Sequence, residues 1–107
     1  MKVTLKARNM PLTESLRTAV EQEITKSVCE LVGFLDARIG IELKLNNSAS
    51  QKKNNECRVV LTIPPYPTII IIETNQNMYQ AIKLAKERLV EKIKLEKSRH
   101  AAAQPTA

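Results

Sequence analysis

Apolar residues recur along this chain with two different periods, and the order in which these periods alternate restricts the fold more than any other feature. A strict alternation of apolar and polar side chains is typical of a β-strand with one buried face. An apolar residue at every third or fourth position is typical of a helix with one buried side. Alternation occurs in three segments, at residues 2–8, 37–46 and 56–63. The helical period occurs in two segments, at residues 14–33 and 78–98.

Both helical segments begin with a residue that can cap a helix. The side chain of Thr13 can accept a hydrogen bond from the first turn of the first helix, and Gly33 is expected to end that helix. Asn75 or Asn77 can cap the second helix. The residues expected to be buried in the first helix are Leu16, Val20, Ile24, Val28 and Leu31. Those expected to be buried in the second are Met78, Ile82, Ala85, Leu89 and Ile93.

A run of β-branched residues at 69–72 predicts a fourth strand, although alternation does not define which of its residues are buried. The elements therefore follow the order β-α-β-β-β-α, and the fold class is α+β. A right-handed connection through the first helix places the first two strands side by side and parallel. Both helices then cover one face of a four-stranded mixed sheet, as in a double-stranded-RNA-binding domain, and the other face is bare.

The length of the chain limits the number of domains. A chain of 107 residues can bury one hydrophobic core, so we predict a single α+β domain over residues 1–98. Residues 99–107 have no core-forming pattern and are predicted to be a disordered tail. The polar segment 47–55 is predicted to be an exposed and mobile hairpin loop.

The charge of the chain favours a polyanionic partner. There are 17 Lys and Arg residues against 11 Asp and Glu residues, which gives a net charge of +6. Much of this excess falls on the second helical segment, where four lysines lie within about 80° of one another on a helical wheel. We call these four the lysine row: Lys83, Lys86, Lys94 and Lys97. Such a row can contact successive RNA phosphates, but it is equally the pattern of an ordinary solvated helix face.

Several other classes of function are not supported by the sequence. No apolar stretch is long enough to span a membrane and no signal peptide is recognisable, so we expect a cytoplasmic protein without a membrane partner. Cys29, Cys57 and His100 do not have the spacing of a metal site. Two glycines are too few for a phosphate-binding loop, so we expect no cofactor, no small-molecule substrate and no enzymatic activity. The first three strands contain no aromatic residue for base stacking.

Two sequence motifs resemble a known family. The first is Lys6-Ala7-Arg8-Asn9, followed by Thr13, Leu16-Arg17 and Val20, and the second is Asn77-Met78-Tyr79-Gln80-Ala81-Ile82 before a lysine-rich helix. Both are similar to motifs of the ribosome hibernation-promoting factors, also called ribosome-associated inhibitors, in their short form without a dimerisation domain. The family commonly has aspartate where this chain has Asn77 and Lys83.

The resemblance implies a function and a set of contact residues. It implies a monomeric hibernation factor that binds the small ribosomal subunit and its RNA at the tRNA and mRNA channel, and inhibits translation by steric occlusion under stress or in stationary phase. The lysine row would make the principal contacts with ribosomal RNA, and Arg8, Arg17 and Lys26 the secondary ones. Two alternatives stay open: a general double-stranded-RNA-binding module, and a protein-interaction adaptor without RNA binding that uses the bare sheet face or the strand at 69–72.

Overall fold

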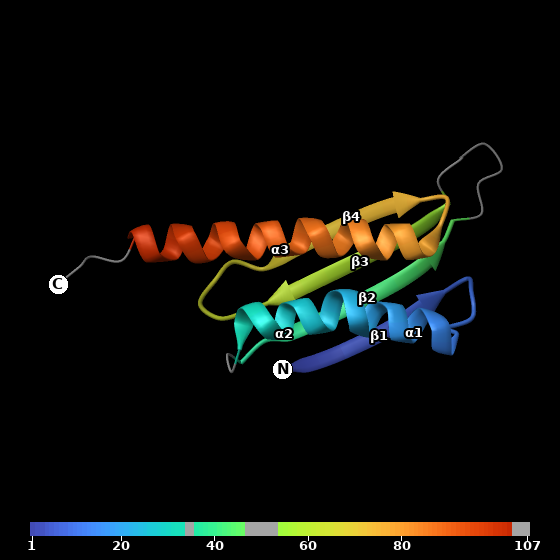
Figure 1. Cartoon of the computed structure of the whole chain (residues 1–107), viewed down its shortest axis with the longest axis horizontal. Helices are drawn as coiled ribbons and strands as arrows, with labels where there is room; N and C mark the ends of the chain where they lie inside the picture. The colour runs from blue at the N-terminus through green and yellow to red at the C-terminus, as the bar shows by residue number, and fades with distance from the viewer. Residues whose placement is uncertain (34–35, 47–53, 104–107) are drawn as a thin grey trace.

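The computed structural model describes residues 1–33, 36–46 and 54–103, and in this part of the chain helices cover one face of a four-stranded sheet (Figure 1). The strands are β1 (Lys2–Arg8), β2 (Arg38–Leu45), β3 (Asn55–Thr62) and β4 (Ile69–Asn75), and they lie in the sheet in this order. β1 pairs with β2 in parallel, and the other two pairs are antiparallel. The predicted fold class and element order are confirmed.

The alternation in the strands separates a covered face from an open face. Ile39, Ile41 and Leu43 of β2 are buried under the helices, and residues of β3 and β4 complete this layer of the core. In β4, whose register the sequence did not define, Ile69 and Ile71 are buried. The side chains between and after them, Ile70 and Ile72, are 55% and 51% exposed on the open face.

The first helix consists of three segments without a break: α1 (Glu14–Val20), a π-helical segment η1 (Glu21–Thr25) and α2 (Lys26–Val32). Leu31, which was expected to be buried, is half-buried, and Val32 is buried in its place. The buried residues therefore recur every four positions, whereas an α-helix turns once in 3.6 residues. The wider turn of η1, in which the Lys26 N–H donates to the Glu21 carbonyl, keeps the buried positions on one side.

The second helix, α3 (Met78–Ala103), lies over β3 and β4 and buries every residue expected from its sequence. Asn77 caps it, because the Asn77 Oδ1 accepts a hydrogen bond from the Tyr79 N–H at 2.9 Å. The helix continues through residues 99–103, which were predicted to belong to the tail. Alanine, which occupies positions 101–103, has the highest helix propensity and needs no core contact to extend a helix. Residues 104–107 lie outside the described residues, and the domain boundary at 98 stays a prediction.

The predicted loop at 47–55 lies mostly outside the described residues. The structure describes its last two residues, of which Asn55 already belongs to β3. The backbone N–H of Asn46 donates to the carbonyl of Asn54 at 2.7 Å, so the two strands stay paired up to the described ends of the hairpin.

Candidate nucleic-acid interface

The lysine row of α3 lies along the side of that helix that faces the first helix. Lys86 Nζ is 3.6 Å from Glu23 Oε2 of η1, and its side chain is only 27% exposed. Lys97 Nζ donates a hydrogen bond of 2.8 Å to the Leu31 carbonyl near the end of α2, where helix carbonyls lack partners within the helix. Two of the four lysines therefore already hold the two helices together.

A groove of about 380 Å³ runs between the two helices. Lys86 and Lys94 line it, together with the carboxylates Glu30 and Glu87. Cations and carboxylates thus both line this groove, and the carboxylates weaken the positive field that a phosphate would meet there. Lys83 is exposed nearer the start of α3.

The three secondary residues do not lie on one surface. Arg17 and Lys26 are exposed on the first helix. Arg8 lies at the end of β1 on the open face of the sheet, where its Nε is 3.3 Å from Glu42 Oε2. The structure therefore divides the predicted contact residues between the helical side of the molecule and the opposite side.

The open face of the sheet carries a larger excess of positive charge than the helices. The helices α1, η1, α2 and α3 contain nine Lys and Arg residues against seven Glu residues. On the open sheet face, six cations accompany the two carboxylates Glu42 and Glu56. The six are Lys2, Lys6, Arg8, Arg38, Lys44 and Arg58.

Only Arg8 of these six was among the predicted contact residues. Lys2 and Lys6 belong to β1, which is an edge strand, and lysines on an edge strand also serve to prevent aggregation. The strand register shows that the positive charge extends beyond the edge strand. Lys2 lies beside Arg38, and the row that begins at Lys6 continues through Glu42 to Arg58. This surface could have been predicted from the sequence by placing the outward-facing residues of neighbouring strands side by side in the predicted strand order.

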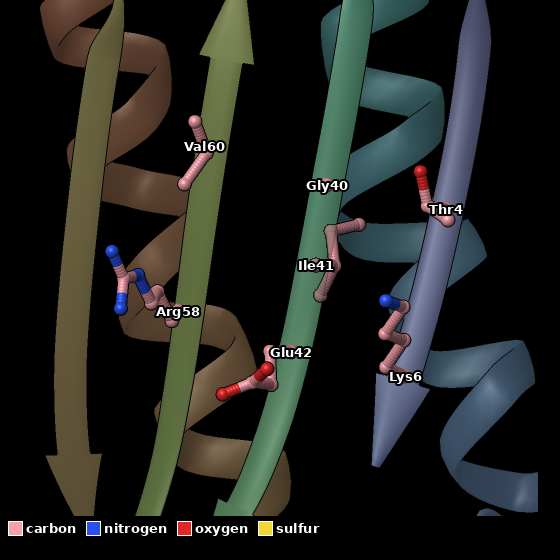
Figure 2. A pocket seen from close by; sticks show the side chains of 7 residues that line it. All are labelled: Thr4, Lys6, Gly40, Ile41, Glu42, Arg58 and Val60. Carbon is pink, nitrogen blue, oxygen red and sulfur yellow. The ribbon is translucent and has the colours of Figure 1, made fainter.

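A shallow hollow of about 260 Å³ lies in the middle of the open sheet face (Figure 2). Gly40 leaves this space, since it has no side chain between Thr4 and Val60 of the adjacent strands. Figure 2 shows Lys6 and Arg58 on either side of Glu42, with the helices behind the sheet. The hollow is open and lined by charged groups.

Other chemistry has little support in the described residues. No group of three or more His, Cys, Asp or Glu side chains that could hold a metal ion occurs among them. None of the described helices is long and apolar enough to cross a membrane. Burial, with smaller contributions from the charges of Glu73 and Glu56, raises the pKa of the Cys57 thiol to about 12. This thiol therefore stays protonated at neutral pH and is a poor nucleophile.

The sequence profile of the family described as Sigma 54 modulation protein / S30EA ribosomal protein matches residues 3–101. The chain belongs to this family. The match spans β2, β3 and β4, all of β1 except Lys2, and nearly the whole of α3. It confirms the resemblance indicated by the two sequence motifs.

The S30EA fold is also recognisable in solved structures. The N-terminal domain of Protein Y from Thermus thermophilus has a TM-score of 0.72 at 22% sequence identity, over 89% of this chain and 98% of that one. A ribosomal subunit interface protein from Coxiella burnetii has a TM-score of 0.72 at 17% identity, over 92% of this chain and 99% of that one. At these identities the likeness shows the fold alone. Comparison with curated proteins gives no significant match.

Proposed function

We propose that this chain is a ribosome hibernation factor that binds the small ribosomal subunit at the tRNA and mRNA channel and inhibits translation by steric occlusion. The observation that carries the proposal is the match to the S30EA ribosomal protein family over residues 3–101. The structural likeness to a ribosomal subunit interface protein supports it, as does the net charge of +6, which suits a surface made of RNA phosphates.

The proposed contacts on the helical side are the lysine row together with Arg17 and Lys26, and Arg8 is a secondary contact on the other side. Within the row, Lys83 and Lys94 would contribute most, because Lys86 and Lys97 are held by Glu23 and by the Leu31 carbonyl. Lys86 gains less from a phosphate because Glu23 already neutralises part of its charge, and Lys97 would first have to give up its hydrogen bond to the Leu31 carbonyl.

Sedimentation tests this function directly. The purified chain is centrifuged with small subunits, large subunits, whole ribosomes or a plain RNA duplex, at low and at high salt. We expect co-migration with small subunits and whole ribosomes that weakens as salt rises, because released counterions drive the association. Equal retention by the duplex would favour a general double-stranded-RNA-binding module. Retention by none of these RNA-containing partners would contradict the proposal.

Order of addition tests the occlusion. In a cell-free translation reaction, the chain should inhibit strongly when it is added before messenger and initiator tRNA, and weakly when both already occupy the small subunit. Inhibition that does not depend on the order would place the binding site away from the channel. A bovine serum albumin control at the same concentration separates this effect from non-specific dilution.

A further inference from the structure

The open sheet face combines three features, and the proposed function does not account for their combination. It carries six cations against two carboxylates, it has a hollow at its centre, and one of its sides is apolar. Its apolar side consists of Val60 with the exposed Ile70 and Ile72. Large side chains such as these are usually buried, so their place beside a cationic surface suggests a partner that is itself both charged and apolar.

The cations surround the centre of the face. The hollow at Gly40 continues into a second one of about 310 Å³, and both are lined by Thr4, Gly40 and Val60. Lys6 and Arg58 line the first hollow. Lys2 and Arg38 line the second. Four cations thus lie around a common floor formed by Thr4, Gly40 and Val60, in which Gly40 has no side chain.

Packing does not require glycine at the centre. A Cβ atom added to Gly40 would meet no atom within 4 Å. Glycine in a strand interior is usually unfavourable, because it loses more conformational entropy than other residues and has no side chain to pack. Because glycine has no side chain, a ligand can approach the backbone closely at the centre of the cationic face.

We propose that the open sheet face binds a single strand of RNA. The phosphates lie against the cations around Gly40, and unstacked bases rest on the aliphatic side chains of β3 and β4. Cations that neutralise phosphates supply the affinity. The described residues of this face include no aromatic side chain on which bases could stack, so the phosphate contacts dominate. Binding is therefore independent of base sequence and depends strongly on salt. This activity goes beyond the proposed function, since it needs no ribosome.

Other partners fit the face less well. A double helix keeps its bases stacked inside and would leave Ile70 and Ile72 without a role. A small nucleotide needs a site that encloses most of its surface, whereas the two hollows are shallow and open. A second copy of this chain would present the same positive face and be repelled. An acidic peptide would meet the cations, but its charged side chains would gain nothing from the aliphatic ones.

Fluorescence anisotropy with a labelled twelve-nucleotide oligouridylate measures the interaction in the intact chain. Three variants are compared with the parent: Lys6→Gln with Arg58→Gln, Gly40→Val, and the matched helical control Lys92→Gln with Arg99→Gln, two exposed residues of α3 outside the proposed contacts. Glutamine is used because Lys6 and Arg58 lie opposite Glu42 in the strand register, and further carboxylates in that row would repel one another and disturb the sheet.

We expect the Lys6/Arg58 variant to bind the oligonucleotide about tenfold more weakly, with a smaller salt dependence. Gly40→Val keeps every charge and favours the strand, yet it fills the hollow and should also weaken binding. The Lys92/Arg99 control should change affinity by no more than about twofold. Circular dichroism and thermal melting confirm that each variant is folded.

Three results would overturn the inference. One is equal affinity for a twelve-base-pair duplex, and another is equal competition by polyglutamate at matched charge. The third is a folded Lys6/Arg58 variant with unchanged affinity. A chain that binds oligouridylate but does not sediment with ribosomes would keep this inference and lose the proposed function.

Discussion

The side chain of Asn77 caps the start of α3. Its Oδ1 accepts a hydrogen bond from the Tyr79 N–H, which has no partner within the helix. Just before it, the Asn75 Oδ1 accepts one from the Asn77 N–H at 3.0 Å. The sequence predicted a cap at one of these two positions, but it could not distinguish them because both are asparagine.

Replacing Asn77 with alanine should lower the free energy of unfolding by about 1 kcal/mol, because the Tyr79 N–H loses its acceptor. Asn77→Asp should keep the stability or raise it slightly, since a carboxylate also interacts well with the N-terminal end of a helix. Urea unfolding followed by circular dichroism measures both. Equal losses in the two variants would show that the amide group has another role.

Cys57 should make stability depend on pH in the alkaline range. Burial raises the pKa of its thiol from an ordinary value of 9.0 to about 12, so the unfolded chain loses this proton first. The free energy of unfolding should therefore fall as pH rises from about 9 toward 12, by at most about 1.4 kcal/mol per pH unit from this group. Unfolding of the parent and of Cys57→Ala between pH 8 and pH 10.5 measures the difference. Parallel pH profiles would contradict the assignment.

At the scale of elements, the sequence predicted the strands better than the details of the helices. Alternation alone places Ile39, Ile41 and Leu43 correctly, because the period of a strand is fixed at two residues. The first helix contains a π-helical segment, and Val32 instead of Leu31 completes its buried side. A spacing of four residues is compatible with an ordinary helix over one or two turns, so the change in winding becomes apparent only over the whole segment.

The π-helical segment contains a polar group that should reduce stability. Thr25 Oγ1 is buried, and none of the described residues offers it a hydrogen-bond partner. Thr25→Val keeps the shape of the side chain and should raise the free energy of unfolding by about 1 kcal/mol. Thr18→Val, at an exposed position of α1, is the matched control and should have almost no effect. Urea unfolding measures the free energy of unfolding of both variants. A loss of stability in Thr25→Val alone would show that the hydroxyl has a hydrogen-bond partner.

At the scale of the whole molecule, the site was harder to predict than the fold. The lysine row was identified from the wheel of one helix, and a wheel does not show which neighbouring helix lies against that side. Contacts with Glu23 and the Leu31 carbonyl involve residues more than sixty positions away in the sequence. The charge of the open sheet face likewise depends on three strands meeting in register.

The two kinds of lysine in the row should therefore respond differently to substitution. Lys83→Gln with Lys94→Gln should leave the melting temperature unchanged and lower the slope of log K against log salt for ribosome binding by about one unit per lost contact. Lys86→Gln with Lys97→Gln should lower the melting temperature, because it removes the contacts between the helices. Thermal melting and salt-dependent sedimentation measure these effects. Identical behaviour of the two pairs would contradict the division of the row.

The sheet is a single layer, and the helices cover one of its faces. The cationic surface of the strands and that of the helices therefore lie on opposite sides of the molecule. A molecule of this form can bind two polyanionic surfaces at once, one against the strands and one against the helices. Each surface also reduces the repulsion between the cations on the two sides of the molecule. We therefore expect it to prefer narrow crevices between polyanionic walls over convex polyanions of the same charge density.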